Sequence, residues 1–86
     1  MSKQSEECIK SAGQEIGDIQ GDYKNLHIKD SFPNEADWDD FNRLLCECLH
    51  AKGCPIEASE LDPFWEENKT FQELIDYIDG QCGYTT

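Results

Sequence analysis

Apolar residues recur along this chain at intervals of three and four positions, which is the period of amphipathic helices. The first such stretch predicts a helix from Ser5 to Ile16, with Ser5 as its cap. Its apolar stripe consists of Ile9, Ala12 and Ile16. No alternating run of strand length stands between turn residues. The pattern therefore predicts an all-α fold.

A long polar connection, residues 18–34, separates the first helix from the second. Four widely spaced apolar residues in it are expected to pin the connection onto the core: Tyr23, Leu26, Ile28 and Phe32. The second helix is predicted to begin at Glu35 or Asp37 and to end at Ala51, before Gly53 and Pro55. Its apolar face consists of Trp38, Phe41, Leu45, Cys48 and Leu49.

Two further helices complete the pattern. A short third helix is expected within residues 58–65, where Pro63 limits its regularity. The last helix has the clearest start, because Thr70 and Glu73 form the sequence of a capping box. Gly80 is expected to end it, leaving residues 81–86 as a frayed tail. The prediction is a single domain over residues 1–86, a four-helix bundle with a long first loop and a short third helix.

The net charge of the chain limits the classes of partner that it can bind. The chain contains nineteen acidic and seven basic residues, and its formal net charge is −12. Such a balance repels nucleic acid and anionic lipid and favours proteins with basic surfaces. No stretch is long and apolar enough to span a membrane. We expect a monomer that binds neither nucleic acid nor membranes.

The five cysteines have neither metal-binding nor redox spacing, and their odd number without a secretion signal predicts reduced, mostly buried thiols in the cytoplasm. His50 and Cys54 are four positions apart, but nothing orients the histidine and Gly53 intervenes. No catalytic triad, dyad or metal site is therefore expected, and the chain is not predicted to be an enzyme.

Three segments resemble the acyl carrier protein family. They are the charged and aliphatic opening Glu6-Glu7-Cys8-Ile9-Lys10, the turn Cys54-Pro55-Ile56-Glu57, and the final helix Thr70-Phe71-Gln72-Glu73-Leu74-Ile75-Asp76-Tyr77-Ile78. The resemblance implies the carrier's four-helix fold and a role in fatty acid, polyketide or peptide synthesis. It also implies an aspartate-serine-leucine triplet at the start of the second helix, whose serine bears a phosphopantetheine arm.

This chain departs from the family at that triplet. Alignment of the aspartates puts Trp38 in the serine position, whereas alignment of the apolar face puts Asp37 there and Trp38 on the leucine. Neither side chain can carry a phosphodiester, and Asp39 and Asp40 would repel a phosphate. No cofactor is therefore expected at this position. Trp38 itself is either part of the core, which we favour, or a recognition residue.

An alternative attachment site is Ser31, because Asp30-Ser31-Phe32 resembles the triplet. If Ser31 is the site, the cofactor is 4'-phosphopantetheine. A helix starting there would place Glu35 and Asp37 at apolar core positions, so we favour Ser31 as a serine in an ordered loop.

The resemblance also implies a docking face for basic synthase or acyl-transfer enzymes on the second and third helices. The candidate residues there are Asp39, Asp40, Glu47, Glu57 and Glu60. The favoured hypothesis is a carrier-like docking protein without the usual arm. The alternatives are a true carrier modified at Ser31 and an acidic inhibitor or nucleic-acid mimic of a basic protein.

Overall fold

The fold is all-α. The computed structural model describes residues 4–16 and 23–83, and these residues contain no strand beyond an isolated bridge between His27 and Thr70. The elements, in chain order, are α1 (Gln4–Ile16), the 3-10 turn η1 (Tyr23–Asn25), α2 (Ile28–Ser31), α3 (Glu35–Ala51), α4 (Ala58–Glu66) and α5 (Phe71–Cys82).

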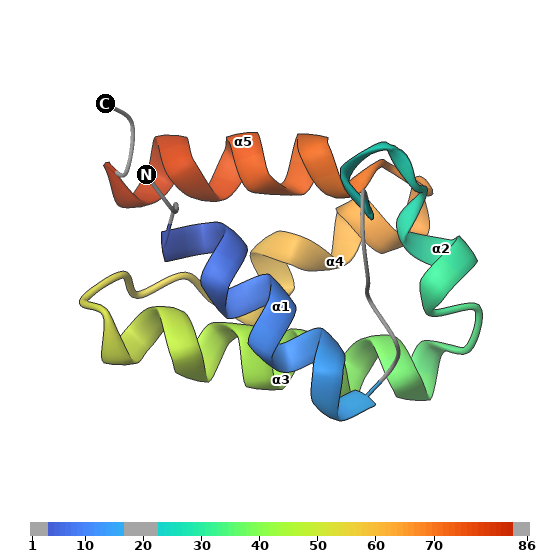
Figure 1. The fold of residues 1–86 in the computed structure, drawn as a ribbon, viewed down its shortest axis with the longest axis horizontal. Coiled ribbons are helices and arrows are strands. Elements are labelled where there is room, and N and C mark those ends of the chain that lie inside the picture. The colour runs from blue at the N-terminus through green and yellow to red at the C-terminus, as the bar shows by residue number, and fades with distance from the viewer. Residues whose placement is uncertain (1–3, 17–22, 84–86) are drawn as a thin grey trace.

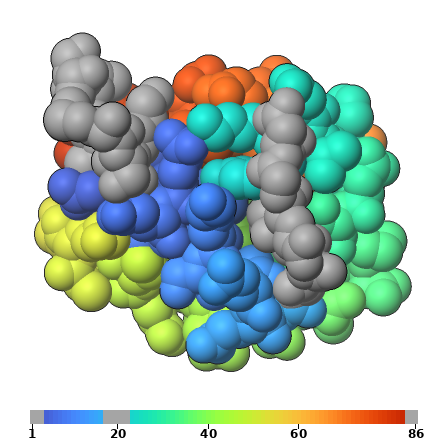
Figure 2. Space-filling view, in the orientation of Figure 1, coloured from blue at the N-terminus to red at the C-terminus, as the bar shows by residue number. Residues whose placement is uncertain are grey.

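The four longer helices, α1, α3, α4 and α5, pack around one core. In Figure 1, α3 and α5 run along opposite sides of the molecule, with α1 and α4 between them. Both α1 and α4 contact α3 as well as α5. On the face drawn in Figure 2, α1 (blue) crosses the middle, with the α3–α4 loop (yellow) on one side and η1 (turquoise) on the other. The described elements thus form a single compact body.

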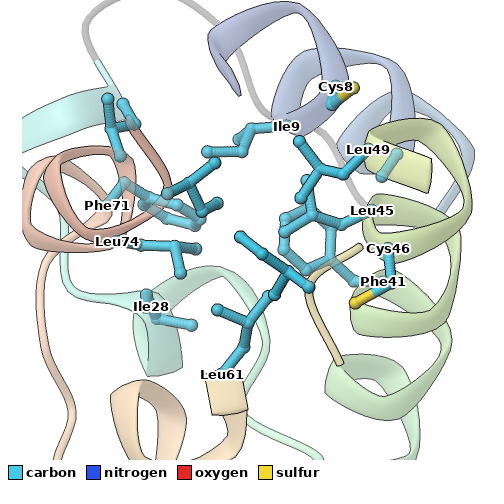
Figure 3. Packing of buried hydrophobic residues seen from close by; sticks show 14 of the residues in the cluster. Cys8, Ile9, Ile28, Phe41, Leu45, Cys46, Leu49, Leu61, Phe71 and Leu74 are labelled. Carbon is cyan, nitrogen blue, oxygen red and sulfur yellow. The ribbon is translucent and has the colours of Figure 1, made fainter. Parts of the chain in front are cut away.

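The core draws side chains from every described helix. Figure 3 shows Ile9, Leu45, Leu61, Phe71 and Leu74 directed toward one another from α1, α3, α4 and α5. All five are fully buried. Since burial of one such side chain contributes about 1.5–3 kcal/mol, this shared core is the main source of stability.

The predicted connection between the first two long helices contains more regular structure than the sequence indicated. It forms η1 and the one-turn helix α2. Tyr23, Ile28 and Phe32 are buried as expected, whereas Leu26 is 44% exposed. Leu26 instead contributes its carbonyl, which accepts a hydrogen bond from the N–H of Phe71 at 3.1 Å. Backbone pairing rather than burial of this side chain anchors the segment.

Both ends of α5 are defined by local chemistry. Thr70 Oγ1 accepts a hydrogen bond from the N–H of Glu73 at 3.3 Å, and Glu73 accepts one from the N–H of Thr70 at 2.9 Å. The predicted capping box is therefore confirmed. The predicted end at Gly80 is wrong, because the helix continues to Cys82. The left-handed residue that ends it is Gly83, with φ of 70°.

Two smaller expectations also change. Residues 81 and 82 are helical rather than part of a frayed tail, while residues 84–86 of the predicted tail lie outside the described residues. Ser5 lies within the first turn of α1, and its hydroxyl donates a hydrogen bond to Asp79 of α5 at 2.5 Å. The Ser5 side chain, which was expected to cap α1, therefore makes a tertiary contact with α5 instead.

The expectation of reduced thiols is wrong for four of the five cysteines. Disulfides join Cys8 to Cys48 and Cys54 to Cys82, and only Cys46 is free. The paired residues are 40 and 28 positions apart in the chain, so their proximity is a property of helix packing that the spacing does not reveal. Cross-links of this length typically stabilise a fold by about 3–4 kcal/mol each.

Candidate functional site at the start of the third helix

The start of α3 places Asp37 and Trp38 in opposite environments. Trp38 is 1% exposed and packs against Phe41, with ring centroids 5.7 Å apart. Asp37 is exposed in the first turn. Of the two predicted readings, the core position of Trp38 is confirmed and Asp37 is the residue presented to solvent. The exposed position in the first turn of α3 is therefore held by a carboxylate.

The buried edge of Trp38 belongs to a polar network between α3 and α4. Its indole N–H donates to Asp62 Oδ1 at 3.1 Å, and the Asn42 side-chain amide donates to the same oxygen at 3.2 Å. Asn42 also donates to the carbonyl of Ala58 at 2.9 Å and accepts from the Cys46 thiol at 3.5 Å. The network fixes the position of α4 against α3, and with it the relative placement of their acidic side chains.

Asn42 and Asp62 were missed by the sequence analysis. Asn42 is 2% exposed and stands on the apolar face of α3, four residues after Trp38. A polar residue in the middle of an apolar stripe is a signal of buried hydrogen bonding, because a buried amide needs a partner. Nothing in the sequence indicated that this partner would be Asp62.

Cys46 is buried beside this network, where three carboxylates act on its thiol. Burial first, and then the charges of Glu57, Glu60 and Asp62, raise its pKa to about 11. The thiol therefore remains protonated at neutral pH and is a poor nucleophile. This environment gives Cys46 a packing role rather than a catalytic one.

Ser31 lies elsewhere. It is half-buried at the last position of α2, four residues before α3 begins. The carbonyl end of a one-turn helix does not offer the free N–H groups that bind phosphate at a helix start. The following Phe32 is buried against Phe41, with ring centroids 4.5 Å apart. Ser31 and Asp37 are thus separate positions on separate helices.

The predicted docking residues divide between two packed helices. Asp39, Asp40 and Glu47 are exposed on α3, and Glu57 and Glu60 are exposed at the start of α4. We call these five residues the acidic surface. The sequences of α3 and α4 contain one arginine or lysine between them, Arg43, which lies 3.8 Å from Asp40 and 3.4 Å from Glu47.

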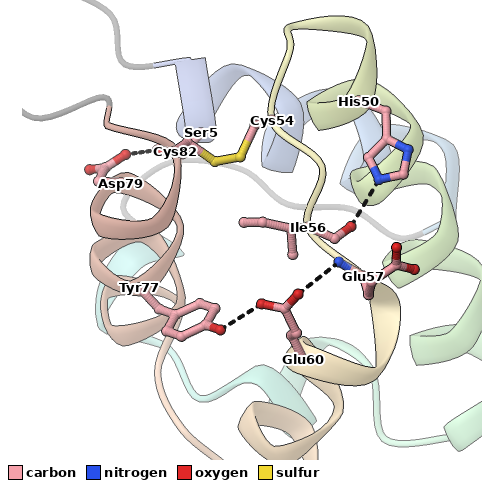
Figure 4. The surroundings of a disulfide bond; sticks show 9 residues. All are labelled: Ser5, His50, Cys54, Ile56, Glu57, Glu60, Tyr77, Asp79 and Cys82. Atoms are coloured by element: carbon pink, nitrogen blue, oxygen red, sulfur yellow. Dashed lines mark hydrogen bonds between the residues drawn. A yellow bond between two sulfur atoms is a disulfide. The ribbon is translucent and has the colours of Figure 1, made fainter.

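The α4 part of the acidic surface is held in place by its neighbours. Glu60 accepts a hydrogen bond from the N–H of Glu57 at 3.3 Å and another from the Tyr77 hydroxyl at 2.8 Å. The bond to Glu60 raises the pKa of Tyr77. These contacts orient Glu60 toward α5, so Glu57 and Glu60 are presented by a helix start of fixed geometry (Figure 4).

No family model matches the chain, and no curated protein or solved structure matches it significantly.

Residues 4–16 and 23–83 also bear on metal binding and on membranes. No three or more histidine, cysteine, aspartate or glutamate side chains gather there in a way that could hold a metal ion. Within the same ranges, no helix has the length and apolar character needed to cross a lipid bilayer.

Proposed function

We propose that this protein is an acyl-carrier-like docking protein. It binds basic surfaces of enzymes in fatty acid, polyketide or peptide synthesis and carries no phosphopantetheine on α3. The observation that carries the proposal is the exposed carboxylate of Asp37 at the start of a helix whose next residue, Trp38, is buried. A charged, unmodifiable side chain takes the place of an attachment residue, while the adjoining acidic surface remains available for docking.

The electrostatics of α3 and α4 support this role. The sequence of α3 contains five acidic residues and that of α4 contains three, whereas Arg43 is the single arginine or lysine in the two helices. Like charges on one surface accelerate encounters with a basic partner, and the rate falls as salt screens them. Such a surface contributes more to association rate and partner choice than to affinity.

The same charges disfavour a phosphate arm at this position. Glu35 and Asp37 in the first turn already interact favourably with the positive end of the helix dipole. A phosphodiester added beside them would meet both carboxylates. The chain therefore acts as a partner of carrier-processing enzymes rather than as a substrate for the arm's attachment.

A phosphopantetheinyl transferase of broad specificity provides the decisive test, because it both docks carriers and modifies them. We expect the protein to bind the transferase, with an affinity that falls as salt rises, and to gain no mass. A mass gain of one phosphopantetheine that disappears in Ser31→Ala would instead establish a true carrier. Absence of binding, together with capture of a DNA-binding protein or nuclease, would favour the acidic mimic.

A matched pair of variants separates the acidic surface from the overall charge. Asp39→Asn combined with Asp40→Asn removes two charges from α3. Glu15→Gln combined with Asp76→Asn removes two exposed charges from α1 and α5. We expect the α3 pair to slow association about tenfold at low salt and the control pair to slow it far less. Equal effects would mean that the net charge alone drives binding, against the proposal.

The disulfides also bear on the redox state of the compartment in which the protein acts. The cytoplasmic prediction rested on an odd number of cysteines without a secretion signal, and the two disulfides contradict the reduced thiols expected with it. Paired cysteines between helices are typical of oxidising compartments. We therefore propose that the protein works where its disulfides persist, and counting the thiols of protein isolated under acid-quenched conditions tests this directly.

A further inference from the structure

One end of the molecule is held together by a disulfide and a hydrogen bond. Figure 4 shows the Cys54–Cys82 disulfide beside the contact between Ser5 and Asp79. These residues come from the first turn of α1, the α3–α4 loop and the last turn of α5. In Figure 1 the three segments meet at the same end of the molecule.

The last turn of α5 buries few side chains. Ile78 is fully buried, but after it only Asp79 is buried, and Gly80 and Gln81 are exposed. Glycine is among the least favourable residues in a helix interior. The turn also contains no basic residue to interact with the negative end of the helix dipole. The disulfide and the Ser5–Asp79 bond are two contacts that help to hold this turn.

The other half of the disulfide is anchored independently. The N–H of Cys54 donates to the carbonyl of Leu49 at 2.8 Å, and His50 donates from its ring to the carbonyl of Ile56 at 3.0 Å. These bonds hold the α3–α4 loop on the end of α3 whether or not Cys54 is cross-linked. Cleavage of the disulfide would consequently release the end of α5 and not the loop.

The Cys8–Cys48 disulfide lies in a different setting. It joins α1 to the last turn of α3, where Cys48 is half-buried as Cys82 is, and the flanking residues Ile9 and Leu49 are fully buried. The contact between these two helices is the most extensive among the described elements. The turn of α3 that holds Cys48 is tied to the core by Leu49, whereas fraying of the last turn of α5 suffices to expose Cys82.

We propose that Cys54–Cys82 is a reversible thiol–disulfide exchange site for a protein or small-molecule dithiol, and that it acts as a latch on the last turn of α5. A thiolate of the dithiol attacks the half-buried Cys82 sulfur, and the Cys54 sulfur leaves and takes up a proton. The second thiol then resolves the mixed disulfide and releases Cys82 as a thiol. Two electrons pass from the dithiol, which becomes a disulfide, to the pair.

Limited reduction of the folded wild-type chain with dithiothreitol tests the proposal. Free thiols are trapped with N-ethylmaleimide at intervals and located by peptide mass spectrometry. We expect Cys54 and Cys82 to be labelled at least about tenfold faster than Cys8 and Cys48, the factor given by a difference of about 1.4 kcal/mol in opening free energy. Simultaneous labelling of all four cysteines, or earlier labelling of Cys8 and Cys48, would overturn the latch.

Amide hydrogen exchange on the singly reduced protein supplies a second measurement. Residues 79–83 should lose protection while the amides of α1 and α3 keep theirs. Unchanged protection of residues 79–83 would mean that the disulfide does not maintain the turn. Reoxidation by a small-molecule disulfide should restore protection, since the exchange is reversible.

A matched serine pair tests the role of the hydrogen bond. Ser5→Ala removes the donor to Asp79 and should accelerate reduction of Cys54–Cys82 about three- to tenfold, because the turn then frays more often. Ser11→Ala changes an exposed serine of the same helix and should leave the rate unchanged. Equal rates in the two variants would exclude Ser5 from the latch.

Discussion

The indole N–H of Trp38 donates a hydrogen bond to Asp62 Oδ1, 3.1 Å away, across the contact between α3 and α4. This bond satisfies the polar atom of a side chain that is otherwise buried. It also couples the start of α3 to the helix that carries Glu60. Trp38 is thus part of the scaffold, and its neighbour Asp37 is the residue exposed to solvent.

Replacing Asp62 with alanine should weaken the α3–α4 contact. The change leaves two donors, the Trp38 indole and the Asn42 amide, without their shared acceptor, so the free energy of unfolding should fall by about 1–3 kcal/mol. Asp39→Ala, at an exposed position on α3, should change it by less than about 0.5 kcal/mol. Urea denaturation measures both. Equal stabilities would mean that water replaces the carboxylate at no cost.

Tyr23 offers a stabilising substitution. Its ring is 3% exposed, and its hydroxyl has no hydrogen-bond partner within residues 4–16 and 23–83. Tyr23→Phe should therefore leave stability unchanged or raise it by about 1 kcal/mol, because no buried hydroxyl remains unpaired. Tyr77→Phe removes a hydroxyl that is bonded to Glu60 and should not stabilise. A clear loss of stability in Tyr23→Phe would reveal a partner for this hydroxyl.

The same residue predicts an alkaline transition. Burial, and then the charge of Glu6, raise the pKa of Tyr23 to about 12 from its usual value of 10.0. The unfolded chain ionises first, so stability is intact below pH 10 and decreases as pH rises toward 12. Tyr23→Phe should lose less stability across this window than the wild type. Circular dichroism melting curves recorded between pH 9 and 11.5 provide the comparison.

Glu73 predicts an acid transition at the start of α5. The hydrogen bond from the backbone of Thr70 holds its pKa below the usual 4.5. A lowered pKa gives stability that is present above pH 4.5 and is lost as pH falls through the lower folded value. Glu73→Gln should therefore lose less stability between pH 5 and pH 2.5 than the wild type does. Glu66→Gln, at the exposed end of α4, is the matched control for the loss of one glutamate carboxylate.

The thiol chemistry predicts a simple count. Without reductant, the native protein should react with no N-ethylmaleimide at pH 7.5, because Cys46 is buried and its pKa is about 11. In denaturant one thiol per chain should react, since the remaining cysteines are paired. Intact mass spectrometry gives the count. Five reactive thiols in denaturant would show that the disulfides do not form.

Much of the helical structure could be predicted because its signals are local. The capping box at Thr70 and Glu73, the glycine at position 53 and the apolar stripe of α5 act within a few residues of one another. The start of α3 at Glu35 likewise falls where acidic residues precede an apolar face. The end of α5 was misplaced because Gly80 is a weak stop signal that the Cys82 cross-link and the Asp79 contact override.

The sequence by itself determined that the chain is helical, acidic and without a hydroxyl at the start of its second long helix, since composition and periodicity act at short range. Tertiary structure decided which of Asp37 and Trp38 faces solvent, which cysteines pair and where Asn42 finds its partners. These outcomes depend on how helices distant in sequence rotate and pack against one another. A one-residue rotation of α3 would exchange Asp37 and Trp38, and the packing of α3 against α1 and α4 prevents it.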